Sequence, residues 1–290
     1  MWIILAVCSA LCLGFYDVMK KLSLRDNNVL LVLLLNTLFG SILMLPVIVD
    51  DFASGRFGPG SVAADHAFIA LKACIVLASW VLGYFAIKHL PLTIQGPVNA
   101  SRPVMVLVGA LLIFGERLNG LQWAGILLGF VSLYFISRIG AREGFSMKHS
   151  RWLWMAIGAT VLGACSALYD KYLLQRYEPL QVQAWYSLYQ LVLMAIAVSV
   201  LRRAGHSTGP FRWRWVIVGI SVFLTAADLA YFYALSLPGA MISVVSMVRR
   251  GSVLVSFAYG VLVLGEGNVR AKLIDLGVLL LSLGLLVAGS

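Results

Sequence analysis

The chain has 290 residues, of which 61% are hydrophobic and only 12% are charged, and its mean hydropathy is +0.93. A soluble domain is usually about 45–50% apolar and about 25% charged, so this composition excludes a soluble globular protein and predicts an integral membrane protein. The formal net charge is +10, but the basic residues lie mostly in short segments between apolar runs. That placement is typical of membrane topology and does not indicate nucleic-acid binding.

Ten apolar runs follow one another along the chain, each about as long as a membrane-spanning helix requires. None of them alternates strictly between apolar and polar residues, so helices are expected and not the strands of a barrel. The expected spans are residues 2–20, 29–49, 67–88, 92–114, 120–138, 152–174, 181–201, 213–236, 239–264 and 270–288. The sequence therefore predicts an all-α integral membrane fold with ten transmembrane helices.

The first half of the chain recurs in the second half. Tyr84 and Phe85 reappear 147 residues later as Tyr231 and Phe232. The same offset carries Arg102 onto Arg249, and both arginines lie inside apolar spans. Matching residues at one fixed offset indicate an internal repeat.

The repeat divides the chain into two units of five helices. We expect residues 1–140 to form the first five-helix repeat and residues 152–290 the second, joined by a connecting loop over residues 141–151. Because each unit has an odd number of helices, the second copy would be inverted in the membrane. Inverted repeats are typical of transporters that work by alternating access.

Loop charges predict an orientation. Lys and Arg gather in the loops that follow the odd-numbered spans, whereas Asp50, Asp51 and Asp65 flank the loop after the second span. The positive-inside rule then places the odd loops in the cytoplasm and both termini outside. The location we expect is a plasma membrane, namely the inner membrane of a bacterium.

A Gly-Glu pair follows each of the matched arginines, at Gly115 and Glu116 and again at Gly265 and Glu266. With the ten spans and the two halves, these pairs resemble the EamA type of the drug/metabolite transporter superfamily over nearly the whole chain. The resemblance implies export or exchange of a small metabolite, by alternating access around a central cavity. Such relatives are usually drawn with both termini in the cytoplasm, which is the reverse of the orientation that the loop charges favour.

Arginines in the middle of spans are the strongest candidates for substrate binding. Arg102 lies between Pro97 and Pro103, and each proline removes a backbone donor, so this helix is expected to break beside a cavity. Arg249 and Arg250 lie midway along the matching span. A structural kink with a paired arginine is the alternative, but a charge at this depth costs at least about 2.5–3.5 kcal/mol, which favours a functional role.

Asp228 is the acid best placed to pair with these arginines. Asp228 is expected to be a counter-ion for Arg249 or Arg250, or else a carboxyl group that takes up a proton during transport. Asp17 and Asp170 hold equivalent places near the ends of the first and sixth spans. Interface salt bridges and gate latches explain those two aspartates equally well.

Aromatic and amide side chains complete the expected substrate site. The candidates are Trp80, Tyr84, Asn99, Trp185, Gln190 and Tyr231. Because the central arginines outnumber the one deep acid, we expect a small anionic or zwitterionic metabolite as substrate. The alternatives are an exporter of cationic or amphipathic drugs and a non-transporting receptor or scaffold.

Catalytic and metal-binding patterns are absent from the sequence. It contains no His-Glu-x-x-His, no paired aspartates of a membrane protease, no Ser/His pair within the spans and no nucleotide-binding glycine loop. We therefore expect no enzyme activity, no catalytic residue, no metal and no cofactor. The expected partners are a small-molecule substrate, a coupled proton or counter-substrate and membrane lipid, for a monomer or homodimer that binds no nucleic acid.

Overall fold

A computed structural model of the chain describes residues 1–24, 27–55, 63–89, 98, 101–139, 151–203, 210–252, 255, 259 and 269–289. Within these residues the secondary structure is entirely helical. The helices are α1 (Trp2–Leu24), α2 (Val29–Ala53), α3 (Ala63–His89), α5 (Arg102–Ile113), α6 (Gly120–Ile139), α7 (Arg151–Leu174), α8 (Pro179–Arg203), α9 (Val216–Ser236), α10 (Ile242–Arg249) and α12 (Val269–Ala288).

Six of the described helices, α1, α2, α3, α7, α8 and α9, are long and apolar enough to cross a membrane. Two shorter apolar helical stretches accompany them, namely α5 (Arg102–Ile113) and the first part of α6 (Gly120–Ser132). Large apolar side chains point outward from the bundle, such as Leu112, which is 80% exposed. A bundle with an apolar exterior matches lipid as its solvent, so the expected all-helical membrane architecture is confirmed.

The two spans that carry the central arginines are interrupted. In the expected span 92–114, α5 begins only at Arg102, and Pro103 lies in the first turn, where its missing N–H needs no helical acceptor. In the expected span 239–264, α10 ends at Arg249, and a turn follows at Arg250 and Gly251. A Cβ on Gly251 would lie 2.9 Å from the carbonyl oxygen of Val248, so the turn requires glycine.

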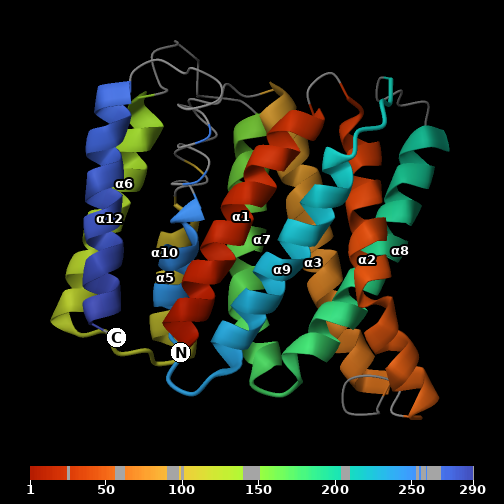
Figure 1. The fold of residues 1–290 in the computed structure, drawn as a ribbon, viewed down its shortest axis with the longest axis horizontal. Helices are drawn as coiled ribbons and strands as arrows, with labels where there is room; N and C mark the ends of the chain where they lie inside the picture. Colours follow the sequence, from red (N-terminus) through yellow and green to blue (C-terminus); the bar gives the residue numbers. More distant parts are fainter. Residues whose placement is uncertain are drawn as a thin grey trace.

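The helices form one bundle, with both termini at the same edge (Figure 1). The four most extensive contacts between helices join α1 to α9, α3 to α7, α2 to α8 and α6 to α12. Each of these pairs takes one helix from the first half of the chain and one from the second. In Figure 1 α6 and α12 form one side of the bundle, and α2 and α8 lie toward the other.

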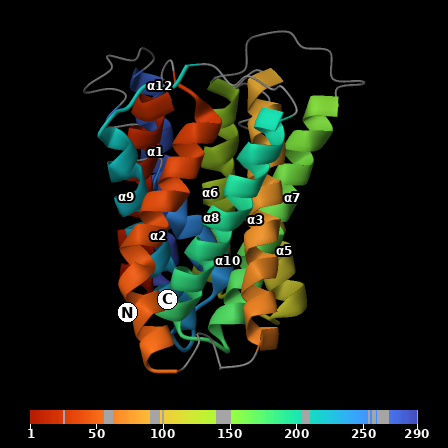
Figure 2. The same ribbon diagram turned by 90° about the vertical axis from the view of Figure 1, so that its right-hand side faces the viewer.

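The short helix α10 lies in the interior. It contacts α1, α5, α6, α7, α9 and α12, and the side chains of Ile242, Val244, Val245 and Met247 are at most 1% exposed. A second view, turned by 90°, likewise shows α10 surrounded by longer helices (Figure 2). Because α5 packs against α10, the start of one helix and the end of the other bring their arginines to the middle of the bundle.

Candidate functional site

A cavity of about 250 Å³ lies among α1, α3, α5, α7, α8, α9 and α10. Its lining residues are Leu13, Tyr16, Lys72, Val76, Trp80, Arg102, Ser166, Ala167, Asp170, Tyr186, Leu224, Asp228, Tyr231, Phe232, Ser246, Arg249 and Arg250. We refer to this space as the central cavity. Four of the lining side chains are cationic and two are acidic, so the described lining carries an excess of positive charge.

Arg102 reaches the central cavity from the first residue of α5. Its Nη2 donates a hydrogen bond to the carbonyl oxygen of Gly163 on α7, at 2.6 Å. A Cβ on Gly163 would lie 2.7 Å from Cζ of Arg102, so glycine is what allows the guanidinium to approach this helix. No carboxylate among the described residues pairs with Arg102.

Arg249 is held by α9. Its Nη2 lies 2.9 Å from Oδ1 of Asp228, and its Cζ lies 4.1 Å from the centre of the Tyr231 ring. The side chains of Arg249 and Asp228 are 18% and 19% exposed, so the pair borders open space. The neighbouring Arg250 also lines the central cavity and has no ion-pair partner within the described part of the chain.

Lys72 is a central cation that the sequence analysis missed. Its Nζ lies 2.6 Å from Oδ1 of Asp170, and both side chains are at least nine-tenths buried. The ammonium group also lies over two aromatic rings, 4.4 Å from the centre of Tyr186 and 3.9 Å from that of Phe232. Lys72 is an isolated charge within the expected span 67–88, and the argument that singled out Arg102 applies to it equally.

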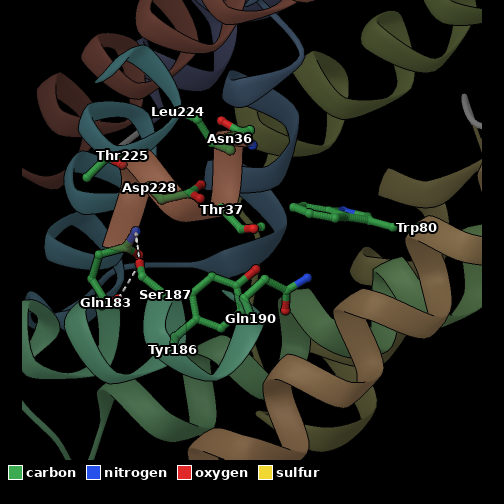
Figure 3. Close-up of a pocket in the computed structure, with 11 residues that line it drawn as sticks. Asn36, Thr37, Trp80, Gln183, Tyr186, Ser187, Gln190, Leu224, Thr225 and Asp228 are labelled. Atoms are coloured by element: carbon green, nitrogen blue, oxygen red, sulfur yellow. Dashed lines mark hydrogen bonds between the residues drawn. The ribbon is translucent and has the colours of Figure 1, made fainter. Parts of the chain in front are cut away.

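A smaller pocket of about 30 Å³ adjoins the central cavity and shares Trp80, Tyr186, Leu224 and Asp228 with it. We call it the amide pocket, because three amide side chains, those of Asn36, Gln183 and Gln190, lie in its wall. Its other lining residues are Thr37, Gly40, Ser187 and Thr225. In Figure 3 the side chains of Asn36, Thr37, Trp80, Gln190 and Asp228 converge on one space.

The structure brings many of the predicted site residues together. Trp80, Arg102, Asp170, Asp228, Tyr231, Arg249 and Arg250 line the central cavity, and Gln190 lines the amide pocket. Asp170 pairs with Lys72, not with the adjacent Lys171. Asn99 and the side chain of Tyr84 lie outside the described residues.

Trp185 and Asp17 do not line either of these spaces. The Trp185 Nε1 donates to Oδ2 of Asp51 at 3.0 Å, and its ring packs edge-on against His66, with ring centres 4.5 Å apart. Trp185 therefore joins the end of α2 to the starts of α3 and α8. Asp17 lies on α1 with an exposed side chain. Nothing in the sequence distinguished the depth of Trp185 from that of Trp80.

Glu116 forms a junction between the two halves of the chain. Its carboxylate accepts hydrogen bonds from Nζ of Lys171 at 2.6 Å, from the backbone N of Ile242 at 2.6 Å and from the backbone N and hydroxyl of Ser243. A carboxylate that accepts from the first backbone N–H groups of a helix caps it. Glu116 thus caps the start of α10, whereas Glu266 lies outside the described residues.

Comparison with known proteins finds similarity in the first part of the chain. The EamA-like transporter family matches residues 1–138. An uncharacterized transporter of Archaeoglobus fulgidus is 26% identical over 143 residues, which are 48% of this chain and 49% of the relative. The chain thus spans about half the length of the curated relative that it matches.

A solved structure, described only as the crystal structure of a protein, is similar over the whole fold. It is 15% identical, the match covers 98% of this chain and 95% of the other, and the TM-score is 0.75. At this identity the likeness shows a shared fold alone. Residues 1–138 are thus similar to the EamA-like transporter family, and the chain is a multi-pass integral membrane protein.

Proposed function

We propose that the protein is a secondary transporter that exports or exchanges a small anionic or zwitterionic metabolite by alternating access. The observation that carries this proposal is the central cavity, where Arg102 and Arg250 line an interior space without a carboxylate partner in the described part of the chain. Buried charges are expensive unless they are paired. An anionic substrate would supply the missing charge.

The chemistry of the guanidinium group supports an anion. Arginine presents a planar fork of donors that matches carboxylate and phosphate oxygens, and hydrogen bonds to charged groups are stronger than neutral ones. Arg249 is already paired with Asp228, and Lys72 with Asp170. Among the described cations that line the central cavity, Arg102 and Arg250 are therefore the ones that remain for a substrate.

The size of the central cavity supports a small molecule. Pockets for drug-sized ligands usually measure about 300–1,000 Å³. The central cavity, at about 250 Å³, lies below that range. A metabolite fits this space better than a large amphipathic drug does.

Contacts between the two halves support the inverted repeat, with residues 1–140 and 152–290 as its units and 141–151 as the connection. If α1 corresponds to α7 and α3 to α9, exchanging the halves turns the α1–α9 contact into the α7–α3 contact, and both are among the most extensive. The contacts α2–α8, α5–α10 and α6–α12 each map onto themselves. This pairing is what a two-fold relation in the membrane plane would produce.

The two ion pairs offer a means of coupling to a proton or a counter-substrate. Asp228 would take up a proton, or accept a different cation, when Arg249 turns to the substrate. Asp170 and Lys72 would act in the same way, or as a gate that opens in each cycle. Asp17 is proposed as a further gating residue at the end of α1.

Export of organic cations is the second candidate function, and one observation favours it. The ammonium of Lys72 lies between an aspartate and two aromatic rings, and such a cage also suits a free cation. The cage is filled by Lys72 in this structure. A cationic substrate would have to displace a side chain of the same charge, so we rank this function below the first.

Counterflow into proteoliposomes tests the proposal. The probes are labelled monocarboxylates, dicarboxylates, phosphate monoesters, amino acids and quaternary amines. We expect uptake of an anion or zwitterion to fall by about ten-fold or more in Arg102→Gln and Arg250→Gln, because each removes charged hydrogen bonds. The matched control is Arg151→Gln, which changes an arginine that stacks on Trp152 at the start of α7. Uptake of quaternary amines alone, unaffected by both cavity variants, would contradict the proposal.

A further inference from the structure

The amide pocket contains hydrogen-bonding atoms that the described part of the protein leaves unpaired. They are Oδ1 of Asn36, Oε1 of Gln183, and both Oε1 and Nε2 of Gln190. The three residues are only 2–3% exposed. Buried polar groups in proteins nearly always have a partner, which is water or a ligand where the protein supplies none.

Acceptors outnumber donors in this set. Three of the four unpaired atoms are amide oxygens, and the carboxylate of Asp228 borders the same pocket. The ion pair with Arg249 engages Oδ1 of Asp228. A wall of acceptors beside a carboxylate suits a group that only donates, and an ammonium group has three donors and no acceptor.

The size and position of the amide pocket define which part of a ligand it could hold. A single water needs about 10–15 Å³ by this measure, so a pocket of about 30 Å³ accommodates an ammonium group but no ring. Trp80, Tyr186, Leu224 and Asp228 line both the pocket and the central cavity. A small molecule in the central cavity can therefore extend one group into the amide pocket.

We infer that the amide pocket binds the ammonium group of a zwitterionic substrate whose anionic group is held by Arg102 and Arg250. This inference rests on the proposed function and narrows it, because it selects zwitterions over simple anions. Asn36, Gln190 and Asp228 recognise the ammonium group.

Binding of matched probe pairs to the purified full-length protein in detergent tests the inference. The pairs are L-alanine and propionate, L-leucine and 4-methylpentanoate, and L-phenylalanine and 3-phenylpropanoate, so each pair differs by one ammonium group. Dissociation constants come from ligand-dependent thermal unfolding. In at least one pair we expect the amino acid to bind about ten-fold more tightly than its partner, as for a charged hydrogen-bonded group.

Variants of the amide pocket should reduce that preference. In Gln190→Leu and Asn36→Leu the ratio within the pair falls toward one, because the amino acid loses more affinity than the probe without the ammonium group does. Gln190→Glu adds a carboxylate and should raise the ratio. This variant keeps the inference testable if the leucine variants fail to fold. Gln175→Leu changes an exposed glutamine in the turn after α7 and is the matched control.

The outcomes separate the two proposals. If the carboxylates bind, lose affinity in Arg102→Gln and show no preference for the ammonium group, the amide pocket holds only water and this inference is overturned while the proposed function stands. If none of the six probes binds, this inference is overturned, and the counterflow assay with the other anions decides the proposed function separately.

Discussion

Glu116 and Lys171 lie 55 residues apart in the sequence, and their side chains meet at the first turn of α10, with Oε1 of Glu116 at 2.6 Å from Nζ of Lys171. Both side chains are more than nine-tenths buried. The pair ties α7 and the segment between α5 and α6 to a short interior helix. Lys171 directly follows Asp170, so the same turn of α7 serves the junction and the central cavity.

Removing the Glu116 carboxylate should destabilise the protein strongly. Glu116→Ala leaves the buried charge of Lys171 unpaired and the start of α10 uncapped, and breaking a buried pair from one side costs about 3–5 kcal/mol. Thermal unfolding in detergent measures the effect, with the exposed Glu178→Ala as control. The double variant Glu116→Gln/Lys171→Met should recover part of the loss, and a single variant as stable as the parent would contradict this role.

Gly163→Ala should weaken anion binding more than it weakens the fold. The added methyl group would overlap the end of the Arg102 side chain, which is flexible and can move away from α7. We expect an affinity loss of about ten-fold, consistent with losing a charged hydrogen bond, with a small change in melting temperature. Gly284→Ala on α12, where a Cβ meets nothing within 4 Å, is the control. Equal binding by both variants would mean that Arg102 does not contact the substrate.

The Lys72–Asp170 pair should behave as a unit. Lys72→Met leaves the Asp170 carboxylate unpaired beside Tyr186 and Phe232, and truncating one side of a buried pair costs about 3–5 kcal/mol. In Lys72→Met/Asp170→Asn no charge remains to be paired, so folding should recover. Transport by the double variant then separates a structural pair from a working one. Full counterflow activity would show that the pair serves the fold alone.

Tyr177 should make the protein less stable at alkaline pH. It lies in the turn between α7 and α8, and burial, together with its hydrogen bond to Asp65 at 2.6 Å, raises the pKa of Tyr177 to about 12. An unfolded tyrosine titrates near pH 10, so the folded state favours the neutral phenol. This contribution is complete below about pH 10 and is lost as the pH rises toward 12. The free energy of unfolding should therefore decline more steeply between pH 8 and pH 12 in the parent protein than in Tyr177→Phe. Parallel curves for the two proteins would contradict this assignment.

Loop charges predict that the turn after α2 faces outward. In a background with the four cysteines replaced by alanine, Ser54→Cys should react with an impermeant maleimide on intact cells, whereas Arg212→Cys should react only after lysis. Both positions are exposed, at opposite ends of the bundle's helices. The reverse labelling pattern would place both termini in the cytoplasm, as the superfamily is usually drawn.

Much of the fold could be predicted because apolar runs of spanning length leave few alternatives in lipid. The helix breaks were harder to predict. Pro103 indicates the break at Arg102, whereas Gly251 is the one residue near Arg249 that indicates a break there. The depth of a side chain in the bundle was harder still to predict. Trp80 and Trp185 both lie in apolar spans, yet only a three-dimensional packing argument separates the one that lines the central cavity from the one that bonds Asp51.

Lys72 and the amide pocket were both missed by the sequence analysis, for different reasons. Lys72 could have been found, because a lone cation in a span needs a partner wherever it lies. Asn36 and Gln183 carry no charge, so the argument from a lone cation in a span does not apply to them. Their shared lack of partners appears only when α2 and α8 are brought together.

Arg102 opens α5 and Arg249 closes α10, so two arginines that match in sequence occupy opposite electrical poles of their helices. Peptide dipoles place about half a positive charge at a helix N-terminus and half a negative charge at its C-terminus. Arg249 is thus offset twice, by its own helix and by Asp228, while Arg102 adds to a positive pole that has no side-chain cap. The potential in the central cavity is therefore expected to be more positive beside Arg102 than beside Arg249, an asymmetry that the sequence repeat conceals.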